Sequence, residues 1–151
     1  MADDPFVDMR HARFDDQRAV MRRIIEAGHC PFCRENILQY HEQPLIHEGK
    51  HWILTPSQWP YASTRLHLLI ISKLHITKLA DLPPEAGLEL IRVLQYAETI
   101  FDIPGGAFAM RFGNTSYSAA SVMHLHGQLI VPDIASPDYK PVRFKIGARR
   151  S

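Results

Sequence analysis

The sequence is poor in cysteine, has almost no excess of charge of either sign and contains no long apolar run. Its 151 residues include two cysteines, and 17 lysines and arginines balance 16 acidic residues. A net charge of +1 gives no overall field that would draw the protein to a nucleic acid polymer or a membrane surface. No segment approaches the roughly 20 apolar residues of a membrane span, and the opening residues, MADDPFVDMR, lack the pattern of a secretion signal. We therefore expect a cytoplasmic protein that binds neither nucleic acid polymers nor membranes.

The rest of the composition is that of one folded domain. A hydrophobic content of 46% in a chain of this length is enough to bury a single core, and no repeat or linker interrupts it. We expect a helical N-terminal preface at residues 1–29, a folded core at residues 30–132 and an extension at residues 133–151. The extension is expected to be a solvated basic end without a site. Its basic residues are Lys140, Arg143, Lys145, Arg149 and Arg150.

Start and stop signals predict two helices. The first is capped by Asp15 and ends at Gly28, a residue type that commonly terminates helices. The second begins near Asp81, just ahead of two prolines, and its apolar stripe continues to about Asp102. The longer helix is expected to pack on one face of a sheet.

Five apolar or alternating segments predict an antiparallel sheet of about five strands. A short hairpin turns at Glu48, Gly49 and Lys50, and the most apolar segment is the candidate central strand. The fold class is therefore α+β. The predicted strands are residues 45–47, 51–55, 66–71, 107–112 and 124–131.

The last of these strands carries an unusual set of polar residues. Because side chains alternate along a strand, His124, His126 and Gln128 share one face and the apolar residues share the other. A single buried histidine is more often a core residue than a catalyst, but three polar groups in line need a common reason. Gly127 between them would let a ligand approach the backbone closely. This combination of imidazoles and a carboxamide suits phosphate chemistry.

The motif HLHGQ at residues 124–128, preceded by Asn114 and Ser121, resembles the active-site strand of the histidine-triad (HIT) superfamily. The segment RLHLLIISKLHITKLADLPPE at residues 65–85 is similar to the other hallmark of that superfamily. The similarity extends over about residues 30–132. Gln stands at position 128, where hydrolytic members carry a third histidine. In this respect the motif resembles galactose-1-phosphate uridylyltransferases and dinucleoside polyphosphate phosphorylases.

The resemblance implies a nucleotidyl transferase or phosphorylase acting on a nucleotide or dinucleoside polyphosphate. His126 would attack the α-phosphorus and carry the nucleotidyl group as a phosphoramidate. Gln128 would donate its amide hydrogen to a phosphate oxygen, and His124 would support the nucleophile by position. Asn114 and Ser121 match positions that hold phosphate, although two alanines replace the residues usual before the serine. The acceptor, the base and the sugar contacts stay open, since residues 55–58 (TPSQ) lack the acidic residue that binds ribose in related hydrolases.

Cys30 and Cys33 form a CPFC segment that allows three interpretations: a structural zinc site, an empty thiol pair or a redox pair like that of glutaredoxins. A redox CxxC should open a helix after a strand, whereas here a predicted helix precedes it. The HIT resemblance implies a zinc site completed by His75 and His124, and no organic cofactor. His29 is only a spare ligand candidate.

Alternatives to the transferase remain. The first is a HIT-type hydrolase of nucleoside phosphoramidates or dinucleoside polyphosphates, which changes only the acceptor. The others are a non-catalytic nucleotide-binding module and a CxxC redox protein. The family implies a homodimer. The remaining histidines of the core have no partner pattern and are expected to be surface or core residues; they are His41, His47, His51 and His67.

Overall fold

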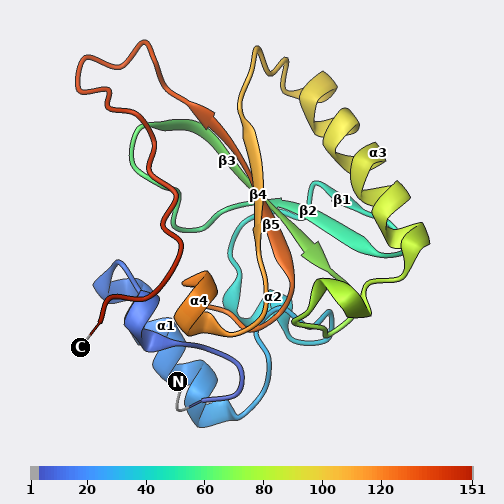
Figure 1. The fold of residues 1–151 in the computed structure, drawn as a ribbon, viewed down its shortest axis with the longest axis vertical. Coiled ribbons are helices and arrows are strands. Elements are labelled where there is room, and N and C mark those ends of the chain that lie inside the picture. Colours follow the sequence, from blue (N-terminus) through green and yellow to red (C-terminus); the bar gives the residue numbers. More distant parts are fainter. Residues whose placement is uncertain (1–3, 151) are drawn as a thin grey trace.

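The computed structural model describes residues 4–150, and its centre is an open sheet of five antiparallel strands (Figure 1). The strand order is β1-β2-β3-β5-β4, so the central strand β3 pairs with β5, which is far from it in the sequence. The expected α+β fold with a five-stranded antiparallel sheet is confirmed. Residues 1–3 of the predicted preface and residue 151 of the predicted extension lie outside the described residues. The strands are β1 His47–Glu48, β2 Trp52–Pro56, β3 Thr64–Ser72, β4 Ala107–Arg111 and β5 His126–Pro132.

Both predicted helices are present, as α1 Asp15–Ala27 and α3 Pro84–Ile100. Phe14, not Asp15, occupies the N-cap of α1, and Asp15 lies in the first turn, where the helix dipole favours a carboxylate. Gly28 ends the helix with φ 68°, a left-handed conformation that glycine adopts without strain. Single turns of helix escaped prediction because they are too short to show a period. These are η1 Met9–His11, α2 Ile37–Tyr40, η2 Leu79–Asp81 and α4 Thr115–Ser118.

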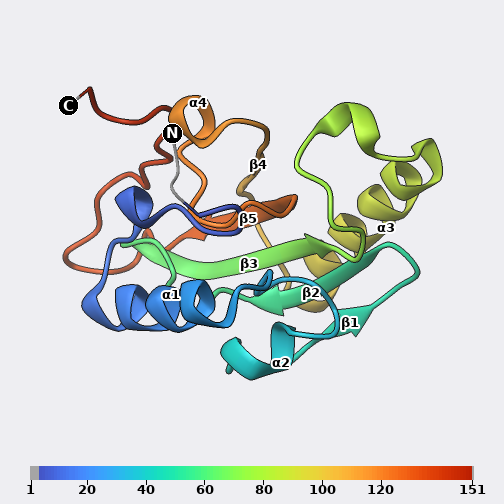
Figure 2. The ribbon, with the colours of Figure 1, turned by 90° about the horizontal axis from the view of Figure 1, so that it is seen from below.

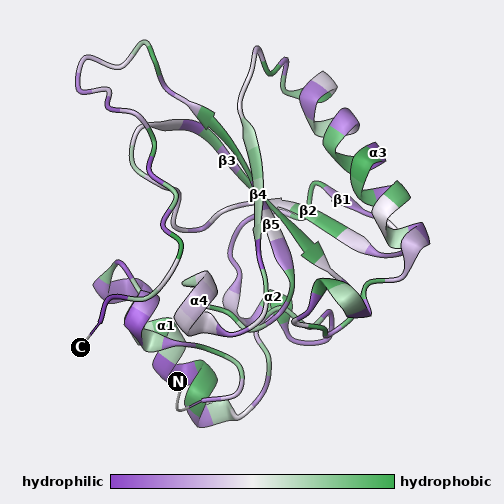
Figure 3. Cartoon of the chain, viewed as in Figure 1, coloured by the Kyte–Doolittle hydropathy of each residue, from purple (hydrophilic) through white to green (hydrophobic). Residues whose placement is uncertain are grey.

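Helix α3 covers one face of the sheet, as expected. Its buried residues Val93 and Ala97 pack on the apolar face of the strands, in the main hydrophobic core. Figures 1 and 2 show α3 running alongside the strands, and Figure 3 shows apolar and polar residues alternating along it. The indole nitrogen of Trp52 donates to the carbonyl of Ala86 at 2.7 Å, which ties β2 to the first turn of α3. This face of the sheet is therefore buried in the hydrophobic core.

The opposite face of the sheet is apolar at one end and polar at the other. Ile37 of α2 packs on Ile53, Leu69 and Ile71. Beyond this cluster, the same face presents buried polar side chains from β3 and β5. Polar groups buried at a sheet face require partners or a ligand, so this end of the sheet is where a site is expected.

Both chain ends fold back against the core. In the preface, Val7 pairs with Val122 in an isolated antiparallel bridge, and the amide of Asp8 donates to the carbonyl of Ser121. In the extension, the amide of Ala148 donates to the carbonyl of Ser116, and Figures 1 and 2 show the red C-terminal segment passing beside α4. The five basic side chains of the extension are exposed, as expected of a solvated basic end. Backbone hydrogen bonds and the ring contact between Phe144 and Tyr61, which composition does not reveal, nevertheless hold the extension against the core.

None of the helices in residues 4–150 is long and apolar enough to cross a membrane.

Candidate active site and metal centre

A cavity of about 640 Å³ opens on the polar end of the sheet. It lies between β3 and β5 on one side and α1, the segment before β5 and the C-terminal extension on the other. His67, His126 and Gln128 line it from the sheet, and Ser121 lines it from the segment before β5. The structure thus brings three of the predicted site residues, Ser121, His126 and Gln128, to one cavity.

His126 is buried and is held in a single tautomer. Its Nδ1–H donates to the carbonyl oxygen of His124 at 2.7 Å, so Nε2 keeps its lone pair. The ring of Phe32 lies edge-on at 5.0 Å between centroids. Burial lowers the pKa of His126 to about 4, which leaves the imidazole neutral and nucleophilic near neutral pH. The position and ionisation of this side chain meet the requirements of a nucleophile.

The side chain of Gln128 is oriented by a chain of hydrogen bonds. The amide of Tyr61 donates to Nδ1 of His67 at 3.0 Å, so the proton of this imidazole is on Nε2. That Nε2–H donates to Oε1 of Gln128 at 2.7 Å. Within residues 4–150 the amide nitrogen of Gln128 donates no hydrogen bond to another group of the protein, so its N–H groups are free to donate into the cavity.

The strand that carries these residues is shorter than predicted. β5 begins at His126, and His124 lies in a bend before it. Nε2–H of His124 donates to the carbonyl of Ser72, and the ring faces the cysteines and not the cavity. His124 contributes its carbonyl oxygen to the nucleophile, not its ring.

The absence of a side chain at Gly127 makes room for a core residue and not for a ligand. A Cβ atom added here would collide with the ring of Phe108, which lies on the face that α3 covers. The alternation of the strand puts position 127 opposite to His126 and Gln128. The expectation that this glycine admits a ligand to the backbone is therefore wrong.

Asn114 does not line the cavity. Its side-chain oxygen accepts from the amide of Ser116 at 2.8 Å and so caps α4. Its predicted phosphate contact stays a prediction.

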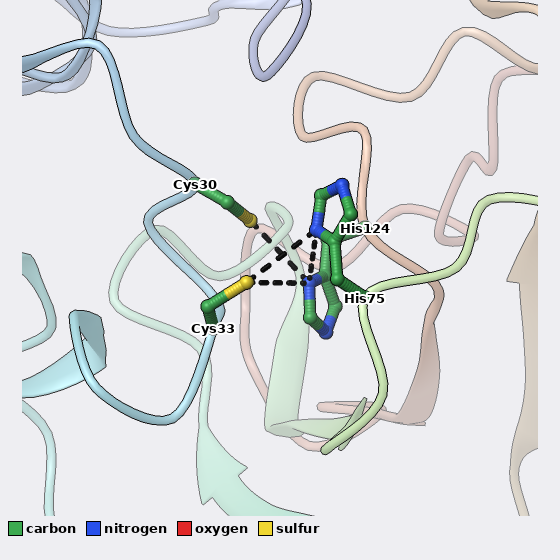
Figure 4. A group of neighbouring side chains, drawn as sticks. All are labelled: Cys30, Cys33, His75 and His124. Atoms are coloured by element: carbon green, nitrogen blue, oxygen red, sulfur yellow. Dashed lines mark hydrogen bonds between the residues drawn. The ribbon is translucent and has the colours of Figure 1, made fainter.

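The four predicted metal ligands converge next to β5, at the bend that precedes this strand, as Figure 4 shows. Cys30 and Cys33 come from the turn after α1, His75 from the segment after β3, and His124 from the bend before β5. Their ligand atoms all lie within 4.8 Å of one another. Among the described residues, no other group of histidine, cysteine or acidic side chains is close enough together to hold a metal ion. His29 is not part of this cluster, because its Nε2 pairs with the hydroxyl of Tyr40 at 2.6 Å.

The distances in this cluster fit a tetrahedral zinc site. Nδ1 of His75 lies 3.2 Å from Nδ1 of His124, and Nδ1 of His124 lies 3.3 Å from Sγ of Cys30 and 3.8 Å from Sγ of Cys33. A tetrahedral zinc with ordinary bond lengths requires about 3.3 Å between two nitrogens and about 3.6 Å between nitrogen and sulfur. The hydrogen bond from Nε2 of His124 to Ser72 also leaves the Nδ1 lone pair directed at the cluster.

The burial of the Cys30 thiol and the partial burial of the Cys33 thiol speak against a redox pair. Burial, followed by the neighbouring Cys30, raises the pKa of Cys33 to about 12. Catalytic redox thiols need a lowered pKa. A bound cation would supply the nearby positive charge that stabilises the thiolate form of both cysteines.

His67 is one of the cavity residues that the sequence interpretation missed. It was expected to be an ordinary core or surface histidine, yet it lines the cavity and contacts Gln128. A signal existed: it is the polar residue in the otherwise apolar run LHLLII of β3. Of the other histidines, His41 is buried and pairs with the hydroxyl of Thr55 at 2.6 Å, and His47 is exposed.

No protein-family profile and no curated protein matches the sequence. Solved structures do match. A zinc-bound histidine triad family protein from Mycobacterium smegmatis is similar at 23% identity, with a TM-score of 0.50, over 74% of this chain and 82% of that one. A HIT family hydrolase from Clostridium thermocellum is similar at 21% identity, with a TM-score of 0.50, over 68% of this chain and 90% of that one. A histidine triad nucleotide-binding protein from Candida albicans is similar at 18% identity, with a TM-score of 0.53, over 87% of this chain and 83% of that one.

The chain therefore has the fold of the histidine-triad proteins. The resemblance seen in residues 65–85 and 124–128 is confirmed at the level of the fold, and the cavity lies beside the strand that carries the motif.

Proposed function

We propose that this protein is a member of the HIT superfamily and transfers nucleotidyl groups through a covalent intermediate on Nε2 of His126. The observation that carries the proposal is the hydrogen bond from Nδ1–H of His126 to the carbonyl of His124, in a cavity that Gln128 also lines. The name of one similar structure, a histidine triad nucleotide-binding protein, supports a nucleotide ligand, and the name of another, a HIT family hydrolase, supports an enzyme.

In the first half of the reaction, the Nε2 lone pair attacks the α-phosphorus of a nucleotide. The bond from phosphorus to the leaving oxygen breaks, and that oxygen keeps the electron pair. Gln128 donates an N–H to a non-bridging oxygen as negative charge accumulates there. An amide does not titrate, so the leaving group must be acidic enough to depart without a proton from Gln128.

In the second half, an acceptor oxygen attacks the same phosphorus and the P–N bond breaks, which returns His126 to its neutral form. Gln128 favours phosphate or a phosphorylated acceptor over water. A hydrolase of phosphoramidates or dinucleoside polyphosphates keeps every role and takes water as the acceptor; the similar Clostridium thermocellum hydrolase favours this second candidate. Ser121 is proposed to hold phosphate from the cavity wall, and Asn114 keeps its predicted contact.

We assign the four-residue cluster of Cys30, Cys33, His75 and His124 to a structural zinc ion. A zinc ion held by these residues would join the turn after α1 to the segments that follow β3 and precede β5. It would also fix the bend that presents the His124 carbonyl to His126. The zinc-bound similar structure from Mycobacterium smegmatis supports this assignment.

The experiment is to incubate the protein with dinucleoside polyphosphates labelled at the α-phosphate. Wild type should retain acid-labile label, and His126→Ala should retain none and lose at least about 1,000-fold in turnover. Label that persists in His126→Ala would refute the assigned nucleophile. Product release measured with and without added phosphate, across a panel of bases, distinguishes a phosphorylase from a hydrolase. The homodimer and the cytoplasmic location stay predictions.

A further inference from the structure

The cavity has a basic lining. Side chains from the preface, from the edge strand β4 and from the extension bring positive charge to it, and no aspartate or glutamate of the described chain lines it. Such a lining attracts a polyanion. The basic lining residues are Arg10, Arg13, Arg111, Lys140, Arg143 and Lys145.

Arg111 stands beside the nucleophile. It pairs with His126 across β4 and β5, and paired residues project to the same face of a sheet. Its Nη1 donates to the hydroxyl of Tyr61 at 2.7 Å, and its Nη2 donates to the carbonyl of Lys145 at 2.7 Å. Its guanidinium carbon lies 3.8 Å from the ring centroid of Phe144. The side chain is held in place by neutral groups only.

Arg13 approaches the same place from the preface. Its guanidinium carbon lies 4.6 Å from the ring centroid of Tyr61, and its Nη2 donates to the carbonyl of Trp59. Tyr61 therefore contacts both arginines, since the guanidinium carbon of Arg111 lies 6.0 Å from its ring centroid. The Tyr61 ring also rests on His67, with 4.5 Å between centroids. Both positive charges thus adjoin the imidazole that orients Gln128.

The two charges have no counter-charge. Among the residues that the structure describes, no carboxylate forms an ion pair with Arg13 or Arg111. Arg10, by contrast, is paired with Asp8 at 2.7 Å. Their field reaches the site: after burial, the positive charges of Arg13 and Arg111 lower the pKa of His67 further. Two converging guanidinium groups with neutral partners form a natural site for a phosphoryl group, which accepts paired N–H donors.

We propose that Arg13 and Arg111 form a second phosphate subsite, distinct from the position of the phosphorus that bonds to His126. This inference rests on the proposed function. In the first half-reaction, the subsite holds the phosphate that leaves. Its two positive charges neutralise the negative charge that develops on the leaving oxygen, whereas the uncharged Gln128 cannot neutralise it. In the second half-reaction, the vacated subsite takes an incoming phosphate. The substrate class is therefore a nucleotide whose leaving group ends in phosphate, in preference to one with an amine leaving group.

The test compares Arg13→Met and Arg111→Lys on two substrates that differ only in the leaving group. One is a dinucleoside tetraphosphate, with the base that the panel identifies, and the other is the matching nucleoside phosphoramidate. Loss of charge-assisted hydrogen bonds should reduce kcat/KM for the tetraphosphate about 10- to 100-fold, with at least a tenfold smaller loss for the phosphoramidate. Equal losses on both substrates would overturn the subsite. Arg92→Met, on the exposed side of α3, is the matched control.

A second arm separates the two sources of phosphate. Labelled enzyme is isolated, and release of the nucleotide is followed as orthophosphate is added. If Arg13→Met abolishes the acceleration by orthophosphate, the subsite takes the acceptor. If only cleavage of the tetraphosphate suffers, it takes the leaving group.

A third arm does not need turnover. Inorganic pyrophosphate is titrated into wild type and Arg13→Met by calorimetry, and the variant should bind at least about 10-fold more weakly. If wild type never becomes labelled at His126, the proposed function fails, yet weaker pyrophosphate binding by Arg13→Met still supports the subsite. Unchanged pyrophosphate binding overturns the subsite whatever the fate of the proposed function.

Discussion

The Nε2–H of His67 donates to Oε1 of Gln128 at 2.7 Å, and this contact fixes which end of the Gln128 amide faces the cavity. The direction follows from the backbone amide of Tyr61, which occupies Nδ1 of the same imidazole. A neutral histidine with one nitrogen accepting must donate from the other. His67 is therefore a positioning residue, which acts on the substrate only through Gln128.

Replacement of His67 by leucine should slow transfer. Without its donor, Oε1 of Gln128 is left unsatisfied and the amide loses its fixed orientation. Removal of one transition-state donor costs about 100- to 1,000-fold in kcat, so loss of orientation should cost about 10- to 100-fold. The rate of label incorporation at His126 measures the effect.

The matched variant is His67→Gln, whose amide keeps an N–H donor. It should recover at least about tenfold of the rate lost in His67→Leu. If both variants fold, judged by equal unfolding midpoints, and react equally slowly, His67 does not orient Gln128.

The buried state of His67 also predicts a pH dependence of stability. Burial is the main cause that lowers its pKa from 6.5 to about 4 in the folded protein. The unfolded chain binds this proton more tightly, so the stabilising effect is complete above pH 6.5 and is lost as the pH falls toward 4. By pH 5 the free energy of unfolding should have fallen by about 2 kcal/mol through this residue.

Urea unfolding of wild type and His67→Gln at several values between pH 7.5 and pH 4.5 isolates this contribution, because glutamine does not titrate. The wild-type curve should lose more stability over this range than the variant curve. Parallel curves would mean that His67 is not held neutral in the folded protein.

Zinc should be present at about one ion per chain and should be lost in Cys33→Ser. Sγ of Cys33 lies 3.4 Å from Nδ1 of His75 and 3.8 Å from Nδ1 of His124, so the serine variant removes one vertex of the tetrahedron. A structural zinc contributes directly to folding, and both Cys33→Ser and treatment with a strong chelator should lower the melting temperature. Metal analysis and thermal unfolding measure the two effects.

His29→Gln is the control, since its ring pairs with Tyr40 outside the four-residue cluster. It should retain zinc. A metal-free wild type that reduces disulfides would instead support the redox interpretation of the cysteine pair.

Periodic and motif signals predicted much of this molecule. The helix that ends at Gly28, the long helix over the sheet and the five strands follow from local patterns, and the HxHxQ motif located the cavity. The cysteine turn and its two histidines were also brought together as expected. These features share one property: each depends on residues that are close in sequence or belong to a recognisable motif.

The missed features depend on long-range packing. The contact from His67 to Gln128 joins residues 61 positions apart, and the hydrogen bond from Arg111 to the Lys145 carbonyl joins an ordinary-looking strand to the extension. A basic tail and a lone core histidine look the same in sequence whether or not they line a cavity. Only the pairing of β3 with β5, and the return of the extension, makes them part of the site.

Gly127 gives the sharpest test of how the catalytic strand is packed. The ring of Phe108 occupies the place where a side chain at position 127 would stand, on the face of the sheet that α3 covers. Gly127→Ala should therefore overpack the core and destabilise the protein by about 1–3 kcal/mol in urea unfolding. Gly87→Ala is the matched control: no atom lies within 4 Å of the added Cβ, and alanine is the better helix former, so it should stabilise α3 by about 0.5–1 kcal/mol.

A double-mutant cycle shows whether Phe108 is the cause of the overpacking. Phe108→Leu alone loses packing, but in the presence of Gly127→Ala it makes room for the new methyl group. The double variant should be more stable than the sum of the single effects by about 1 kcal/mol or more, because the two residues touch. Simple additivity would mean that the added methyl group collides elsewhere. The cycle thus separates a glycine required by the aromatic ring behind the strand from one required by a ligand in front of it.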